Sequence, residues 1–254
     1  MDEVVLAGTL KVRGYDLKTG AERWVVEGTT GFACTTMVTG GGMLYFAGFS
    51  PGASDSPWPA WPDFLAQNGK KGGGEVALEE LPADRRDFLR GLDLNHDGKI
   101  AKDDWDLLLT ASAKAKNVMV AINPGGKGDI TATHVAWQYS RGLPYVPSPL
   151  FYDGRIYMVK DGGLITAVDA KAGTASYSQS RLNANGSYYA SPVAADGRIY
   201  LASLPGKVTV IKSGGDKPEI LHQAELGERI FASPALVENK LYLRSENHLW
   251  AFGE

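Results

Sequence analysis

The chain has 254 residues, a formal net charge of −3 and a sequence pI of about 5.9. Nucleic-acid binding requires a basic patch, which this balance does not supply, so we expect no nucleic-acid partner. The apolar runs are strand-sized and far shorter than the roughly 18 residues of a membrane helix, so we expect no membrane span. Cys34 is the only cysteine, which excludes an intrachain disulfide, and its apolar neighbours predict a small core residue. No signal peptide is recognisable at the start.

The N-terminal part, residues 1–49, is expected to form propeller blades. Three strands are predicted first, over residues 4–6, 11–16 and 22–26. A turn from Asp16 to Gly20 joins the last two, because aspartate accepts local backbone hydrogen bonds and glycine allows positive φ. A second copy of this half-repeat has Tyr177 at the position of Trp24. Large aromatic residues at fixed repeat positions predict packing between blades.

The next blade is interrupted by an insertion. A strand pair is expected over residues 32–38 and 43–47, and the blade resumes at residues 118–123 and 134–137. The sequence therefore predicts that residues 50–115 are inserted between the second and third strands of one blade, and that residues 116–254 continue the propeller.

The sequence of the insertion predicts two helices joined by a loop. Proline residues predict that residues 50–63 are irregular, and a glycine-rich segment over residues 69–74 is expected to be a flexible polar link. Apolar spacing predicts one helix over residues 84–92 and a second helix that begins with residues 104–109.

Between these helices lies a twelve-residue segment that matches the calcium-binding loop of an EF-hand. Gly98 supplies the sharp turn at the sixth position, and Ile100 is the usual apolar residue at the eighth. Calcium prefers hard oxygen ligands, which here would be the side chains of Asp93, Asn95, Asp97 and Asp104 and the carbonyl of Lys99.

Two departures from the usual loop lower the expected affinity. Asp104 stands where a bidentate glutamate is usual, and we find no second loop of this pattern. A lone loop with three coordinating carboxylates predicts weak calcium binding, with Kd roughly 10⁻⁵–10⁻³ M. The alternative is an aspartate-rich turn that no longer binds metal.

The C-terminal part contains a repeat. Residues 148–157, 191–200 and 233–242 share the pattern Ser-Pro, a turn, and a strand that ends in tyrosine, and they start 43 and 42 residues apart. A period of about 40–45 residues is typical of a four-stranded propeller blade. Asp-Gly between apolar runs favours a tight hairpin turn.

We therefore predict an all-β fold, a β-propeller of four-stranded blades with a helical EF-hand insertion. The strands group as an open arc of about five blades, part of a larger propeller, because both end blades have only three strands and each already contains the middle ones. Unpaired edges of this kind invite pairing with another chain.

The sequence resembles the PQQ-like (quinoprotein-type) β-propeller repeat proteins of bacteria at residues 16–24, 121–131 and 134–137. Proteins of this family often carry EF-hand insertions. The resemblance implies a propeller, commonly of eight blades, and a location outside the cytoplasm, periplasmic or secreted. Many members of this family lack the quinone cofactor, so PQQ is not expected here.

The resemblance leaves two functions open. A quinone-dependent (PQQ) alcohol or sugar dehydrogenase typically needs a vicinal disulfide, which Cys34 alone cannot form, and no haem-attachment motif is present. The recurring aspartates lie in turns, where a structural role is expected: Asp16, Asp153, Asp169 and Asp196. We therefore predict no catalytic or quinone-binding residues and a scaffold for a protein or polysaccharide partner; the alternative is a dehydrogenase fragment.

Overall fold

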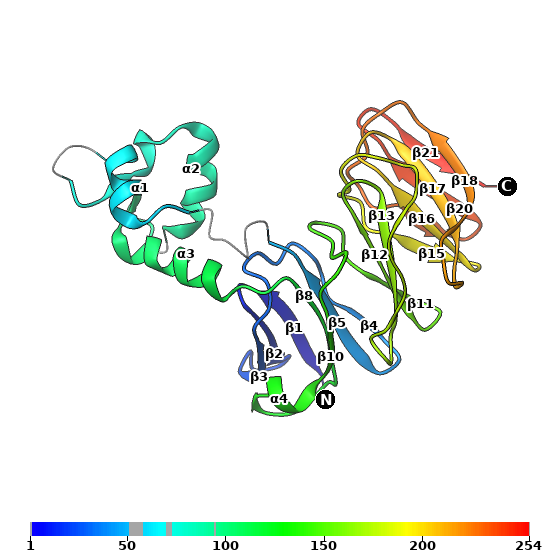
Figure 1. The fold of residues 1–254 in the computed structure, drawn as a ribbon, viewed down its shortest axis with the longest axis horizontal. Helices are drawn as coiled ribbons and strands as arrows, with labels where there is room; N and C mark the ends of the chain where they lie inside the picture. The colour runs from blue at the N-terminus through cyan, green and yellow to red at the C-terminus, as the bar shows by residue number, and fades with distance from the viewer. Residues whose placement is uncertain (1, 51–57, 70–72, 94, 254) are drawn as a thin grey trace. The chain divides into compact units, whose positions relative to one another are not determined.

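The structure is a computed structural model that describes residues 2–50, 58–69, 73–93 and 95–253 (Figure 1). Its contacts divide the chain into two compact units. The first consists of residues 1–50 and 116–254, and the second of residues 51–115. In the described residues, no helix is long and apolar enough to cross a membrane.

The first unit begins with two sheets. Their strands are β1 (Glu3–Gly8), β2 (Lys11–Asp16), β3 (Glu22–Glu27) and β9 (Gly128–Asp129), then β4 (Val38–Gly40), β5 (Met43–Gly48), β8 (Val118–Ile122) and β10 (Val135–Tyr139). The second sheet has the order β10-β8-β5-β4, and the second unit lies in the chain between β5 and β8. The short strand β9 pairs in parallel with β3, and the sequence analysis did not predict it.

Three sheets follow in chain order. Their strands are β11 (Leu150–Tyr152), β12 (Arg155–Lys160), β13 (Leu164–Asp169) and β14 (Ala175–Arg181), then β15 (Val193–Ala195), β16 (Arg198–Ala202), β17 (Lys207–Lys212) and β18 (Glu219–Glu225), and finally β19 (Ala235–Val237), β20 (Lys240–Arg244) and β21 (Leu249–Phe252). The third and fourth sheets are antiparallel meanders of four strands. The propeller of four-stranded blades is therefore confirmed.

The ends of the propeller unit are not joined by strand pairing. Among the described strands, β21 pairs with β20, and β1 pairs with β2; neither end sheet pairs with the other. The first and last sheets lie at the blue and red ends of the chain in Figure 1. The expectation of an open arc agrees with this topology. Three strands were expected in each end sheet, but only the last sheet has three, because β9 adds a fourth strand to the first.

Aromatic and aliphatic side chains fill the spaces between successive sheets. Trp24 is fully buried and packs in one cluster with Phe46 and Val120 of the second sheet. Tyr177 lies between the third and fourth sheets, in a cluster with Ile199 and other buried residues. Both aromatic residues therefore have the interblade position that their place in the repeat predicts.

The aspartates at the repeated turns accept hydrogen bonds from nearby backbone groups. One oxygen of Asp16 accepts from the backbone N–H groups of Lys18 and Thr19, at 2.9 and 2.8 Å. Asp169 accepts equivalent bonds from Lys171 and Ala172. Arg23 also pairs with Asp16 and, by favouring the charged carboxylate, holds the pKa of Asp16 well below its usual range.

The prediction of a strand over residues 32–38 is wrong for most of that segment. The strand begins only at Val38, and Cys34 is exposed instead of buried. Its neighbour Thr35 is the buried residue, and the Thr35 hydroxyl donates to the carbonyl of Ala47. A polar side chain with a backbone partner therefore fixes this segment, which an apolar pattern cannot indicate. His134, the predicted start of a strand, ends the short helix α4 (Thr131–His134).

The second unit is mainly helical. Its elements are α1 (Trp61–Asn68), β6 (Val76–Ala77), the 3-10 turn Leu78–Glu80, α2 (Ala83–Leu89), the 3-10 turn Arg90–Leu92, β7 (Lys99–Ile100) and α3 (Lys102–Lys114). The expectation of irregular structure over residues 50–63 is wrong at its end, because α1 begins at Trp61. Pro62 lies in the first helical turn, where a missing N–H does no harm. Residues 51–57 and 70–72 lie outside the described residues.

Candidate metal centre

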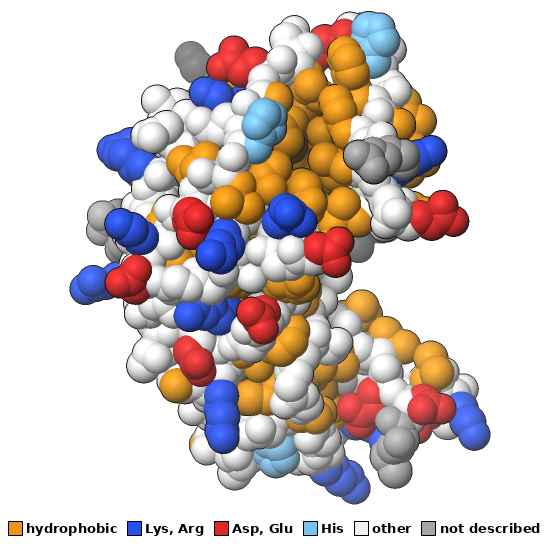
Figure 2. Space-filling view, turned by 90° about the vertical axis from the view of Figure 1, so that its right-hand side faces the viewer, with side chains coloured by type: hydrophobic (Ala, Val, Ile, Leu, Met, Phe, Trp, Pro, Cys, Tyr) orange, Lys and Arg blue, Asp and Glu red, His pale blue; other side chains and the backbone are white. Residues whose placement is uncertain are grey.

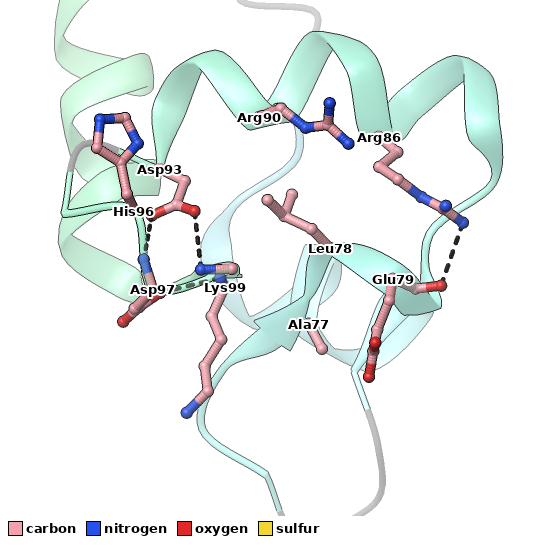
Figure 3. Close-up of a pocket in the computed structure, with 10 residues that line it drawn as sticks. Ala77, Leu78, Glu79, Arg86, Arg90, Asp93, His96, Asp97 and Lys99 are labelled. Atoms are coloured by element: carbon pink, nitrogen blue, oxygen red, sulfur yellow. Dashed lines mark hydrogen bonds between the residues drawn. The ribbon is translucent and has the colours of Figure 1, made fainter.

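Asp93 organises the loop that the sequence analysis singled out. The residue is buried, and its two carboxylate oxygens accept hydrogen bonds from the backbone N–H groups of Asp97 and Gly98, at 3.1 and 2.9 Å (Figure 3). Gly98 has a φ of +81°, which side chains rarely adopt. The loop therefore makes the sharp turn that the sequence places at its sixth position.

Asn95 and Asp97 lie on the exposed side of this turn. The amide oxygen of Asn95 accepts from the Asp97 N–H at 3.2 Å, and its amide nitrogen donates to Asp97 Oδ2 at 3.0 Å. The other oxygen of Asp97 accepts from the backbone N–H of Lys99 at 2.9 Å. These contacts bring the first, third and fifth positions of the loop together.

Asp104 lies apart from that group, in the first turn of α3. Its Oδ2 accepts from the backbone N–H of Ala101 at 3.0 Å, so the side chain caps the start of this helix. In the described part of the chain, no three histidine, cysteine or acidic residues are close enough together to hold a metal ion. The donor types fit a hard cation, but Asp104 does not join the other carboxylates in this arrangement.

Lys99 directs its side chain away from the loop. Its ammonium group pairs with the carboxylate of Glu75 at 2.8 Å, and this pairing raises the pKa of Lys99. His96 is exposed and has a φ of +58°. Neither side chain competes for the position of a bound cation, which leaves the carbonyl of Lys99 as the oxygen available at the seventh position.

A short antiparallel ladder supports the loop, and the sequence analysis missed it. Ile100 pairs with Val76, and both side chains are fully buried. The N–H of Leu78 also donates to the carbonyl of Gly98 at 2.9 Å. The loop is therefore braced by residues 76–78, although those residues carry no calcium-loop pattern. A two-residue strand after a glycine-rich segment gives no periodic signal that could have revealed it.

A groove of about 560 Å³ opens beside the loop. Its walls include residues of both signs of charge: Glu79, Arg86, Arg90, Asp93, Asp97 and Lys99. Arg86 donates to the carbonyls of Glu79 and Leu81, at 3.2 and 2.9 Å, and so ties this wall to the turn before α2 (Figure 3). Among the described residues that line the groove there is no serine, threonine or cysteine.

One cluster of reactive residue types elsewhere was not expected. Glu228 accepts hydrogen bonds from Ser245 Oγ and from His248 Nδ1, both at 2.5 Å. The bond from Ser245 lowers the pKa of Glu228. In a catalytic triad the hydroxyl of the nucleophile donates to the histidine. Here the Ser245 hydroxyl and the His248 ring both bind the Glu228 carboxylate instead. The arrangement closes the loop before β21 and carries no catalytic geometry.

Comparison with known proteins places the chain within one family. The sequence profile of the family described as outer membrane protein assembly factor BamB matches residues 90–253. No curated protein sequence matches at a significant level.

Two solved structures are similar over the whole chain. BamB from Moraxella catarrhalis is 13% identical with a TM-score of 0.57, and the match covers 99% of this chain and 55% of that one. The computationally designed protein Ika8 is 10% identical with the same TM-score of 0.57, and the match covers 100% of this chain and 56% of that one. The chain thus spans little more than half the length of either structure.

Proposed function

Because the chain belongs to the family of the outer membrane protein assembly factor BamB, we propose that it is a non-catalytic propeller scaffold. The observation that carries this proposal is the family match over residues 90–253, well over half of the chain. A fold like that of Moraxella catarrhalis BamB supports it. We place the scaffold outside the cytoplasm, in the periplasm or secreted, where it binds a protein or a polysaccharide.

The side chains of the propeller support a binding role. Aspartates that could have held a cofactor are occupied in turns: Asp16 and Asp169 accept backbone hydrogen bonds. The Glu228 carboxylate is likewise occupied by Ser245 and His248. Groups with these partners hold the loops in place. We therefore assign these residues to the rigidity of the scaffold.

We further propose that the loop of the second unit binds calcium. Asp93, Asn95 and Asp97 already lie together on one tight turn, and the ladder between Ile100 and Val76 holds the following segment. Like charges repel, so the carboxylates come together fully only around a cation. Binding would draw the Asp104 side chain from its capping position towards the loop. Because Asp104 is one methylene shorter than the usual glutamate, the loop should have a lower coordination number and should tolerate magnesium better than the usual loop does.

Calcium is expected to stabilise the second unit. A ligand that binds only the folded state contributes about 2.7 kcal/mol when its concentration is 100 times Kd. Isothermal calorimetry on the full chain should show a saturable heat with Kd roughly 10⁻⁵–10⁻³ M. Calcium should also slow proteolysis within residues 58–115. Asp97→Ala should abolish both effects.

Asp103→Ala is the matched control, because Asp103 is an exposed aspartate of the same segment at a position that supplies no ligand. This variant should bind calcium as the parent does. If the parent gives neither heat nor protection up to millimolar calcium, the loop does not bind the ion. Equal losses in Asp97→Ala and Asp103→Ala would also contradict the assignment.

A further inference from the structure

Four aromatic side chains form a row across the loops at one end of the propeller unit. One is Phe49, which directly follows β5 and is half-buried. The others lie in the loops between successive sheets: Tyr145, Tyr189 and Phe231, which are 41%, 42% and 49% exposed. We call these four side chains the aromatic row. Its members therefore come from four successive parts of the propeller repeat.

The members of the aromatic row lie next to one another. The rings of Phe49 and Tyr145 meet edge to face with their centroids 6.5 Å apart, and the centroids of Tyr189 and Phe231 are 5.6 Å apart. Burial raises the pKa of Tyr145, and the nearby Cys34 and Tyr189 raise it further. Tyr145 and Tyr189 are therefore close enough to interact, so the row runs from the second sheet to the loop before the fifth.

The exposure of this row does not depend on the ends of the chain. Tyr145 and Tyr189 lie in the loops that lead into the third and fourth sheets, and each of these sheets packs against a sheet on both sides. Figure 2 shows that apolar side chains also gather on the side where the last sheet lies in Figure 1. The aromatic row differs from that surface, because its tyrosines are exposed on sheets that have both neighbours.

Two cations lie over the ends of the row. The Nζ of Lys160 is 5.9 Å from the centroid of the Phe49 ring, and the guanidinium of Arg229 is 4.8 Å from that of Phe231. Electron-rich ring faces attract cations, so these contacts hold the charges beside the row. Within the described part of the chain, neither cation forms an ion pair with a carboxylate. Both charges are therefore available to a ligand.

The acidic residues at this end leave those cations unneutralised. Asp161 accepts a hydrogen bond from the backbone N–H of Tyr188 at 2.7 Å, and the Glu228 carboxylate is bound by a serine and a histidine. Glu246 is exposed, and Arg141 adds a further exposed cation in the loop of Tyr145. The charge around the row therefore suits an anionic ligand.

The backbone of these loops is largely paired within the protein. The N–H of Ser148 donates to Ser191 Oγ at 2.9 Å, and the N–H of Ser191 donates to Ser233 Oγ at 2.8 Å. Neighbouring loops also exchange backbone hydrogen bonds. By contrast, no described residue forms a hydrogen bond with the hydroxyl of Tyr145 or of Tyr189. Rings, hydroxyls and cations are therefore the groups left to recognise a ligand.

We propose that the aromatic row binds an acidic polysaccharide. The apolar faces of the sugar rings would stack on the aromatic rings, and uronic acid carboxylates would pair with Lys160 and Arg229. The hydroxyls of Tyr145 and Tyr189 would bind sugar hydroxyls. An acidic peptide fits less well, because extended peptides are recognised through backbone hydrogen bonds that these loops make among themselves. The inference rests on the proposed scaffold function and does not depend on calcium.

Isothermal calorimetry of the full chain with hexagalacturonate tests the proposal, in a buffer with EDTA so that no calcium is bound. The parent should give a saturable heat, and binding should weaken as salt is added, because salt screens exposed charges. Tyr189→Ala and Phe231→Ala should each weaken binding by about three- to ten-fold, since each removes one stacking ring. Tyr189→Phe keeps the ring and should lose less. Lys160→Gln combined with Arg229→Gln should remove most of the salt dependence.

Phe252→Ala and Lys171→Gln are the matched controls. Phe252 is 42% exposed and lies opposite Leu241 in the last sheet, outside the aromatic row. Lys171 is exposed in the turn after β13, at the other end of the sheet from Lys160. Both variants should bind hexagalacturonate as the parent does, and every variant should keep the melting temperature of the parent.

Three results would overturn the inference. The first is a parent that gives no heat with hexagalacturonate up to millimolar concentration. The second is equal binding of the neutral methyl ester, or tighter binding of hexaglutamate or oligothymidylate. The third is an equal loss in Phe252→Ala and Phe231→Ala. The scaffold itself is tested separately, by quinone binding and dye reduction, so its failure is distinguishable from that of the polysaccharide site.

Discussion

Replacing Trp24 by alanine is expected to lower the free energy of unfolding of the propeller unit by about 3–5 kcal/mol. The ring is fully buried between the first and second sheets, and its Nε1 donates to Glu3 Oε2 at 3.0 Å. The substitution would therefore leave a large cavity and an unpaired carboxylate oxygen. Gly14 cannot fill the space, since it supplies no side chain. Urea denaturation followed by circular dichroism measures the loss.

The matched control for Trp24 is Leu17→Ala, in the turn that follows β2. Leu17 is 57% exposed, so its truncation should change stability by less than about 0.5 kcal/mol. A loss below about 1 kcal/mol in Trp24→Ala would contradict the tight interblade packing described above. Within the first sheet the ring also lies close to Gly14 of β2, where an added Cβ would be 2.2 Å from the ring of Trp24.

Trp105→Ala is expected to unfold the second unit while the propeller unit stays folded. Trp105 is buried, stacks on Phe64 with a centroid distance of 3.7 Å, and donates from Nε1 to the carbonyl of Pro59 at 3.0 Å. A loss of about 3–5 kcal/mol should exceed what a helical unit of this size can tolerate. Hydrogen exchange would show lost protection over residues 58–115 and unchanged protection in β12 and β13.

Leu107→Ala is the control for that experiment, because Leu107 lies on the same helix and is 50% exposed. Its exchange pattern should match that of the parent. Global loss of protection in Trp105→Ala, extending to the propeller strands, would contradict the expectation that the second unit can unfold while the propeller unit stays folded.

Hairpin turns made the propeller predictable from sequence. Asp153 and Asp196 have positive φ, and each is followed by a glycine that also has positive φ, which is the conformation that a tight hairpin requires. Glu238 adopts the same conformation in the last copy, although glutamate does not favour it. The repeat position predicted that turn where the residue type did not.

Segments fixed by single polar contacts were not predictable. The Thr35 hydroxyl bond holds a stretch that reads as a strand, and Cys34 is exposed as a result. Helix α1 was missed because Pro62 suggested irregular structure, although proline suits a first turn. Likewise the ladder between Val76 and Ile100 joins residues distant in sequence, which no local pattern reports.

The candidate site was predictable in part. The turn at Gly98 and the contacts among Asp93, Asn95 and Asp97 follow from the spacing of these residues. The capping role of Asp104 could not be predicted from the calcium-loop pattern. An aspartate at this position can either cap the start of α3 or act as the twelfth-position ligand of the loop. Whether the loop binds calcium stays a prediction.

The measurement that tests the central claim most directly is a titration of the purified full chain with pyrroloquinoline quinone and calcium, followed by an assay for dye reduction with alcohols and sugars. A scaffold predicts no stoichiometric quinone binding and no substrate-dependent reduction of the dye. Stoichiometric binding of the quinone together with substrate-dependent dye reduction would contradict the scaffold and favour a dehydrogenase fragment.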